Sequence, residues 1–245
     1  DVYRTYGNAE LTKDSSYSAS NITGLVNGDN YDTSAITVNK TSDGAVDDLA
    51  SGKTTNDAGN YEWTGSASTT NAGLDKNYNL VVTGNGKSTV EKATLSVTLN
   101  DVYRTYGNAE LTKDSSYSAK KIEGLVNGDS YDASAITVNK TSDGAIDNLA
   151  SGKTTNDAGE YSWTGSASTT NAGLDKNYNL VVTGNGKSTV EKATLNVSLN
   201  DVVRTYGDAD FTKGNYGASN ITGLVNGDSY DASAITVNKT SDGAV

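Results

Sequence analysis

The chain is built from one sequence of 100 residues that repeats. Residues 1–100 and 101–200 align without a gap and differ at eleven positions, and residues 201–245 are the first part of a third copy with one residue deleted. A period of 100 is too long for one coil of a solenoid and has the length of a whole small domain. The repeat therefore predicts a row of similar domains, and any fold for one copy must also suit the others.

One phrase joins each copy to the next. It reads KATLSVTLNDVYRTYG at residues 92–107 and KATLNVSLNDVVRTYG at residues 192–207, and the chain begins inside the same phrase. Apolar residues alternate with polar ones over residues 93–99, which is typical of a strand with one buried face. We therefore place the predicted domains at residues 1–91, 92–191 and 192–245, and we expect the chain to be a segment of a longer protein.

Differences between the copies indicate which residues face inward. The polar neighbours of Tyr61 and Trp63 change between copies one and two, whereas the two aromatic residues do not. Residues 95–99 show the same pattern, with changes only at positions 96 and 98. A half-buried strand requires this period of two. The predicted core is Tyr61, Trp63, Leu95, Val97 and Leu99 with their counterparts Tyr161, Trp163, Leu195, Val197 and Leu199.

The remaining pattern is also that of strands. We expect further strands at residues 2–6, 16–22 and 35–39, and a hairpin in which residues 78–83 turn at Gly84-Asn85-Gly86 and pair with residues 88–90. The one predicted helix is residues 46–51, because Asp43 can cap it and Gly52 can end it. The fold class is therefore mainly β, an elongated tandem array of small β-rich domains with at most one short helix per repeat.

Composition excludes several kinds of function. The chain has no Cys and no His, which rules out disulfides, cysteine-ligated zinc and the commonest general base. A net charge of −11 argues against a nucleic-acid partner, which requires a positive surface. No apolar run approaches the roughly 20 residues of a membrane span. Since Glu62 becomes Ser162 in the second copy, a duplicated acidic active site is not expected either, and we predict that the chain is not an enzyme.

Five phrases in a fixed order carry a family resemblance. They are residues 5–7 (TYG), 24–29 (GLVNGD), 56–61 (NDAGNY), 76–80 (KNYNL) and 92–95 (KATL). In this order the chain resembles the MBG-type repeats, related to YDG-type repeats, of filamentous-haemagglutinin-like bacterial surface adhesins. The resemblance implies a secreted or cell-surface, β-rich stalk without catalytic residues. This repeat is longer than the family's, and residues 41–53 are the candidate insertion.

Acidic loops make calcium the first candidate ligand. Asp29, Asp32, Asp43 and Asp47 supply carboxylate oxygens within loops. Their spacing matches neither an EF-hand nor a glycine-rich nonapeptide repeat, and the neighbouring Asp48 becomes Asn148 in the second copy. The alternative is that these residues are solvated turn carboxylates, so we expect no cofactor apart from a weak calcium candidate.

Two further kinds of site stay open. Tyr3 and Tyr31 could stack on a sugar, although Tyr3 becomes Val203 in the third copy. A Lys–Asn or Lys–Asp isopeptide bond would suit a load-bearing domain that lacks Cys, but the sequence does not bring the necessary groups together.

We expect a structural stalk that projects a distal binding region of a bacterial adhesin or filament. The partners would be the neighbouring repeats of the chain and an unidentified receptor on a host or bacterial surface. Domains of about 100 residues have a radius of gyration near 13 Å, so two and a half in line would give a rod approaching about 100 Å. The alternatives are repeats that each bind a glycan or host protein, and a fibre that self-assembles by strand exchange.

Overall fold

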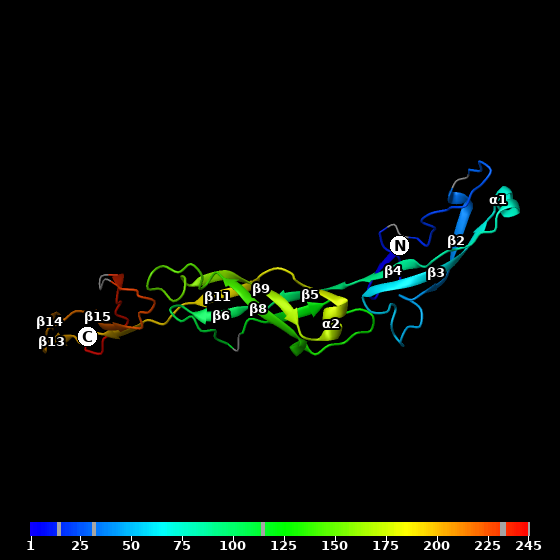
Figure 1. The fold of residues 1–245 in the computed structure, drawn as a ribbon. Coiled ribbons are helices and arrows are strands. Elements are labelled where there is room, and N and C mark those ends of the chain that lie inside the picture. The colour runs from blue at the N-terminus through cyan, green and yellow to red at the C-terminus, as the bar shows by residue number, and fades with distance from the viewer. Residues whose placement is uncertain (14–15, 31–32, 114–115, 231–233, 245) are drawn as a thin grey trace. The chain divides into compact units, whose positions relative to one another are not determined.

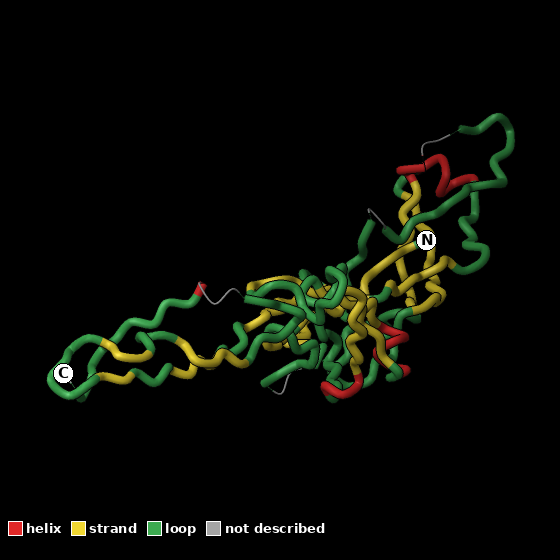
Figure 2. Tube along the Cα trace, turned by 90° about the vertical axis from the view of Figure 1, so that its left-hand side faces the viewer, coloured by secondary structure: helices red, strands yellow, loops and turns green. Residues whose placement is uncertain are grey.

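The chain is mainly β. A computed structural model describes residues 1–13, 16–30, 33–113, 116–230 and 234–244 (Figure 1). Strands are far more extensive than helices, which are short, as Figure 2 shows in yellow and red. The strands are β1 (Val2–Thr5), β2 (Ile36–Asp43), β3 (Gly59–Thr69), β4 (Gly86–Glu91), β5 (Ala93–Leu99), β6 (Val102–Thr105), β7 (Ala119–Glu123), β8 (Ile136–Asp143), β9 (Gly159–Thr169), β10 (Tyr178–Val182), β11 (Gly186–Glu191), β12 (Asn196–Leu199), β13 (Val203–Arg204), β14 (Phe211–Lys213) and β15 (Ala218–Thr222).

The helices differ from the prediction. Residues 46–51 form turns, and the helices are instead α1 (Ala72–Asn77) and α2 (Ala172–Asn177), with 3-10 turns η1 (Thr33–Ala35) and η2 (Ala133–Ala135). Asn71 caps α1 because its side-chain oxygen accepts hydrogen bonds from the amides of Gly73 and Leu74. Six residues make less than two turns, so helical periodicity cannot reveal such a helix; the Asn cap is its one sequence signal.

By their internal contacts the residues divide into two compact units. Unit 1 consists of Asp1–Val97, Ile122–Thr137 and Ala167–Val182, and unit 2 of Thr98–Lys121, Val138–Ser166 and Thr183–Val245. Both units combine segments from different sequence repeats, so they do not coincide with the consecutive ranges 1–91, 92–191 and 192–245. Below, the first, second and third repeats mean residues 1–100, 101–200 and 201–245.

A four-stranded sheet recurs in the first two repeats. Its order is β1-β4-β3-β2 in the first and β6-β11-β9-β8 in the second (Figure 1). The edge strand runs parallel to its neighbour, with Val2 opposite Ser88 and Val102 opposite Ser188. The pairs β3-β4, β2-β3 and β9-β11 are antiparallel. The predicted strand that contains Tyr61 and Trp63 is the long strand β3 of this sheet.

A second sheet has the order β10-β5-β7. Strand β10 pairs in parallel with β5, from Tyr178 opposite Ala93 to Val182 opposite Val97. The predicted hairpin is therefore wrong, since residues 178–182 do not pair with β11 and the matching residues 78–82 form no strand at all. A tight-turn sequence permits a hairpin, but it does not determine the partner strand, and residues 178–182 pair with β5 instead.

The interior holds a buried ion pair in each complete repeat. The Arg4 guanidinium lies 3.0 Å from the Asp43 carboxylate, and both side chains are almost fully buried. Arg4 also donates to Ser88 Oγ at 2.7 Å, and Tyr17 donates to Asp43 at 2.7 Å. Burial raises the pKa of Asp43, but hydrogen bonds, first that from Tyr17, outweigh it and the net pKa is lowered. Arg104, Asp143, Ser188 and Tyr117 repeat this network.

Candidate functional site

Strand β5 of the first repeat is held by residues of the second repeat. Its partner β10 lies in unit 1 together with residues 93–97, and the side chains of Leu95 and Val97 are 0% exposed. The apolar face that the sequence predicted for this strand is therefore covered. We call the contacts that residues 122–137 and 167–182 make with the first repeat the filled joint.

Helix α2 fixes the start of β10 in the filled joint. Asn177, at its last turn, accepts a hydrogen bond from the Ala58 amide at 2.8 Å and donates to Asp57 at 3.0 Å. Lys176 lies 2.7 Å from the same Asp57 carboxylate. The hydrogen bond from Lys176, followed by that from Asn177, lowers the pKa of Asp57. One short helix thus satisfies both the backbone and the charge of the loop 56–59.

A loop of the second repeat makes the other half of the joint. The Asn127 side-chain oxygen accepts from the Thr54 amide at 2.6 Å, and its amide donates to the Thr55 carbonyl at 3.0 Å. Asn127 holds a positive φ of 60°, a conformation that Asn tolerates better than most residues. Val126 packs so close to Gly7 that a Cβ on this glycine would lie 2.5 Å from it. The GLVNGD and TYG phrases are therefore the two surfaces of one contact.

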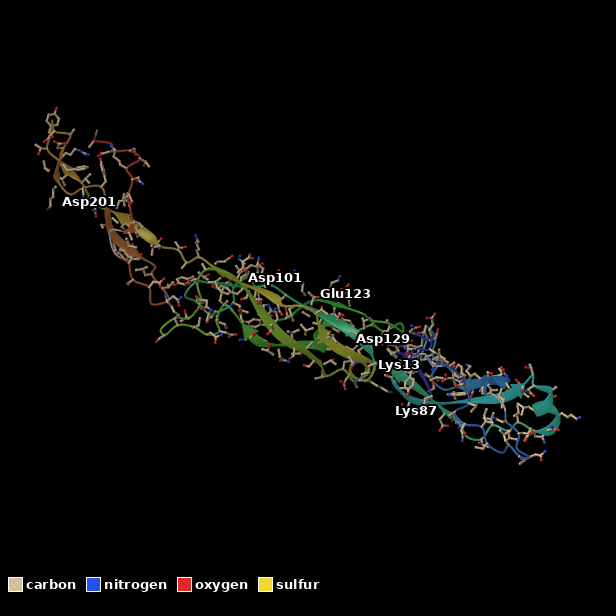
Figure 3. The ribbon with its side chains drawn as sticks, turned by 90° about the horizontal axis from the view of Figure 1, so that it is seen from above. Lys13, Lys87, Asp101, Glu123, Asp129 and Asp201 are labelled. Carbon is tan, nitrogen blue, oxygen red and sulfur yellow. The ribbon has the colours of Figure 1, made fainter. Side chains whose placement is uncertain are left out.

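Tyr178 connects the loop and the strand. Its ring meets that of Tyr6 edge-on with 5.5 Å between centroids. Its hydroxyl donates to Asp129 at 2.9 Å, as the Tyr6 hydroxyl does at 2.8 Å, and Lys53 also contacts this carboxylate, which Figure 3 labels. Burial raises the pKa of Asp129, but the hydrogen bonds, first that from Lys53, outweigh it and the net pKa is lowered.

Unit 2 contains the same loop contacts. Asn226 and Asp228 of the third repeat meet Thr154, Lys153 and Tyr106 as Asn127 and Asp129 meet their counterparts. Where the filled joint holds residues 176–178, unit 2 has a cavity of about 380 Å³ lined by Tyr106, Asp157, Ala158, Leu195, Leu224 and Asp228 among others. We call this cavity the open groove.

Exposure of the adjoining strand follows from the open groove. Strand β12 pairs on one edge with β15, with Val197 opposite Ile221. Leu195, Val197 and Leu199 are 41%, 40% and 68% exposed, whereas Leu95, Val97 and Leu99 are 0%, 0% and 2% exposed. The same phrase is thus covered at residues 95–99 and exposed at residues 195–199.

The first repeat has a complementary gap, which we call the strand slot. It is a cavity of about 440 Å³ between residues 18–24 and 78–86, with Trp63 and Val38 also lining it. Trp63 is 6% exposed, and its indole Nε1 has no hydrogen-bond partner among the described residues. In unit 2 the matching Trp163 Nε1 donates at 2.9 Å to the carbonyl of Asn100, the residue that follows β5. The strand slot is therefore the place that the end of a β5-like strand takes in the second repeat.

The predicted core residues fall into three groups. Trp63, Trp163, Leu95, Val97 and Leu99 are buried, and Tyr61 and Tyr161 are half-buried because their hydroxyls reach the carbonyls of residues 57 and 157. The expectation of burial fails for Leu195, Val197 and Leu199. Their sequence pattern is correct for a buried strand, but among the described residues β12 is paired with β15 alone.

The calcium candidates are engaged in other contacts, and the Asp43 amide donates to the Asp47 carboxylate at 2.5 Å. Asp43 is the buried partner of Arg4, Asp47 lies 3.7 Å from Lys40, and Asp29 accepts from the Tyr78 hydroxyl at 2.6 Å. Asp32 and the sugar candidate Tyr31 lie outside the described residues. Within the described ranges, no three His, Cys, Asp or Glu residues form a group that could hold a metal. Tyr3 is half-buried beneath the Lys13 amine, 5.2 Å from the ring centroid.

Sequence reasoning missed the residues that build these contacts. Arg4, Asn127 and Asn177 were not singled out, because a lone Arg or Asn has no periodicity. The signal that could have found them is their presence in every copy that includes the position, inside the phrases RTYG, GLVNGD and DKNYN. A phrase kept intact on a loop, where substitution is usually tolerated, indicates a contact.

The comparisons with known proteins add no relative. No family model, no curated protein and no solved structure matches the chain. In the part of the chain that the structure describes, no helix has the length and apolarity needed to cross a membrane.

Proposed function

We propose that this chain is a structural spacer of a secreted or cell-surface bacterial adhesin or filament, in which tandem β-rich repeats form an extended stalk that carries a binding region. The observation that carries the proposal is the filled joint. A flexible linker would leave the repeats independent, whereas here β5 of one repeat is a strand in a sheet that the next repeat completes.

The contacts of the filled joint favour stiffness. They combine five parallel residue pairs with buried polar contacts by Asn127 and Asn177. A change in the angle between the repeats would break all of these contacts at once. The link is also short, since only residues 100 and 101 separate β5 from β6. Because the phrases recur in each copy, every joint would have the same geometry, as in other repeat proteins.

The location of the spacer rests on the family resemblance of the five phrases. An acidic chain without Cys, built from nearly identical repeats, suits a stalk outside the cell better than an enzyme. Tyr6, Tyr178 and Lys53 converge on Asp129 and so serve a contact between repeats.

Small-angle X-ray scattering of the 245-residue chain tests the spacer. We expect a maximum dimension approaching about 100 Å, from domains in line with radii of gyration near 13 Å. Asn127→Ala should broaden the distance distribution because it removes the buried amide from the joint. Asn27→Ala, at the matching loop of the first repeat, is the control and should change nothing. A compact particle, or a chain as flexible before as after Asn127→Ala, would contradict the proposal.

Two further measurements address the alternatives. Adding a chelator during scattering would reveal calcium-dependent stiffness, which we do not expect. Glycan-array and cell-binding assays should be negative for a spacer, and specific binding by this chain would favour the binding-module function instead.

A further inference from the structure

We propose that the second repeat is a load-bearing module, because the chain enters and leaves it through neighbouring parallel strands that tension would shear. Two strand pairs, β6-β11 and β5-β10, share the load in this arrangement. The inference deepens the proposed spacer function, and its biological role rests on that function, since a spacer held at both ends is put under tension. The spacer would then resist extension as well as bending.

Strands β6 and β11 are the first and the last strand, along the chain, of the four-stranded sheet in the second repeat (Figure 1). They are parallel neighbours, with Val102 opposite Ser188 and Thr105 opposite Glu191. Tension from the first repeat pulls β6 at its amino end, and tension from the third repeat pulls β11 at its carboxyl end. In a parallel pair the amino ends of both strands lie on the same side. The two forces therefore act in opposite directions along the strands, and all four residue pairs carry the load at the same time.

The positions of the two loaded ends favour shear over peeling. Glu191 pairs with Thr105, three residues beyond Val102 along β6. Three residues of a parallel strand span about 10 Å, whereas neighbouring strands lie about 4.8 Å apart. The line from Val102 to Glu191 therefore runs mainly along the strands. A force along this line stretches the hydrogen bonds of the pair together instead of one after another.

The pair β5-β10 is loaded in the same way. Strand β5 is pulled at its amino end by the first repeat, and β10 is pulled at its carboxyl end, because residues 183–185 connect it to β11. Their five residue pairs run in parallel from Tyr178 opposite Ala93 to Val182 opposite Val97. These two forces are also opposite in direction along parallel strands, so tension shears this second pair as well.

The two pairs resist the same extension. One connection from β5 to β11 follows residues 100 and 101 into β6 and crosses the β6-β11 pair. The other connection crosses the β5-β10 pair and follows residues 183–185. As long as either pair is intact, the residues between β5 and β11 cannot be drawn out. Both pairs must therefore break before the repeat lengthens.

Burial and side-chain contacts strengthen the two pairs. Leu95, Val97 and Val102 are 0% exposed, so water does not readily replace the hydrogen bonds that are stretched there. Arg104 on β6 donates to the buried Ser188 Oγ on β11 at 2.8 Å and forms its ion pair with Asp143. Sliding β6 along β11 therefore also breaks buried contacts of a charged group, which are costly to lose.

Single-molecule force spectroscopy in two directions tests the shear geometry. The sequence has no Cys, so two introduced cysteines define where the chain is held. Lys92→Cys/Lys192→Cys loads both pairs in shear, and Glu110→Cys/Lys192→Cys pulls the carboxyl ends of β6 and β11 apart, with all three positions exposed. Unfolding should require at least about twofold more force in shear, because the residue pairs then share the load instead of breaking in turn. A lengthening of about 300 Å identifies unfolding of the repeat in both directions.

The control for this comparison is stability. Urea unfolding should give the same free energy for the two cysteine variants, so that a difference in force reports the direction of pulling and not the stability of the fold. Forced unfolding depends on the barrier along the direction of pulling, which equilibrium unfolding does not measure. Equal forces in the two directions, or a larger force in peeling, would overturn the proposal.

Added slack tests whether both pairs share the load. Ten Gly and Ser residues inserted between residues 184 and 185 lengthen the connection from β10 to β11 without changing a residue of either pair, so that β6-β11 is loaded first. The force at which Lys92→Cys/Lys192→Cys yields should fall by about half, because only the four β6-β11 pairs then carry it. A step of about 35 Å should precede the main one as the inserted residues straighten. The same insertion between residues 151 and 152, in an exposed turn outside both connections, should leave the force unchanged. An unchanged force without the extra step after the first insertion would show that β5-β10 carries no load, against the proposal.

The force measurements and the scattering test of the spacer can fail separately. A chain that is extended and stiff in solution but yields equally in both directions would keep the spacer and refute the load-bearing role. A chain that is flexible in solution but yields at different forces in the two directions would refute the spacer and leave the shear geometry standing.

Discussion

The first and second repeats carry the same YNLVV sequence and give it different structures. At residues 178–182 it is strand β10 on β5, and at residues 78–82 it is an irregular segment with Val81 and Val82 exposed. The ASNIT sequence shows the same difference, since it is a strand at residues 218–222 and irregular at residues 19–23. Local sequence is constant in both pairs, so the partner strand decides whether a strand forms.

This comparison shows that one repeat is not a self-sufficient folding unit. Its four-stranded sheet and its buried Arg–Asp pair form within the repeat, but the second sheet needs β5 from the preceding repeat. Extended backbone gains little without a partner, because its N–H and C=O groups then bond only to water. The natural unit of stability is therefore a repeat together with the strand that precedes it.

The greatest difference in the free energy of unfolding is expected between substitutions of Leu95 and of its counterpart Leu195. Leu95→Ala should lower the free energy of unfolding by about 2–5 kcal/mol, since it leaves a cavity beneath a fully covered strand. Leu195→Ala should change it by about 0.5 kcal/mol or less, as expected for an exposed site. Urea unfolding followed by circular dichroism, at concentrations where the chain is monomeric, measures both. Equal losses would show that the two strands are covered alike.

Asn177 and Asn77 give the next contrast. Asn177→Ala should cost about 1–3 kcal/mol, because the part-buried Ala58 amide loses its acceptor. Asn77→Ala should be close to neutral, since Asn77 is exposed. Hydrogen exchange at the Ala58 amide would show the local effect, with faster exchange only in Asn177→Ala. Unchanged exchange in that variant would contradict the contact.

The tryptophans differ by a single hydrogen bond. Trp163→Phe removes the bond to the Asn100 carbonyl, whereas Trp63→Phe removes no bond. Both changes delete the same atoms from a buried ring, so the bond should make Trp163→Phe more destabilising by about 1 kcal/mol. The same urea titration checks the difference, and a larger loss at Trp63 would reverse the assignment of the empty and filled slots.

The smallest effect concerns the acid titration of the filled joint. Because the pKa of Asp57 is lowered in the folded chain, its contribution to stability is present above the unfolded value, near about 3.9, and is lost as the pH falls through the folded value. Lys176→Ala should raise this pKa toward the unfolded value, since the Lys176 hydrogen bond is the first cause of the shift. Carboxyl NMR of Asp57 measures it, and Lys76→Ala is the matched control that should leave it unchanged.

The mainly β class and the faces of β3 and β5 could be predicted from the sequence alone. These follow from alternation and from substitutions confined to outward positions, which reflect the geometry of a strand and need no knowledge of its neighbours. The same local rules also misplaced the helix, because a six-residue helix is too short to show a periodic pattern. They misplaced the hairpin because a turn sequence does not determine which strand pairs with which.

Which predicted strands are paired and covered depends on contacts that form in the folded chain. Leu195, Val197 and Leu199 have the pattern of a buried face but are exposed. The partners of Arg4 and Asn177 are distant in the sequence, since Asp43 lies 39 positions from Arg4 and Ala58 lies more than 100 positions from Asn177. Burial and hydrogen bonding are properties of pairs of segments brought together by the fold. A repeated sequence specifies both surfaces of each joint, but whether the two surfaces meet depends on which copies lie next to each other.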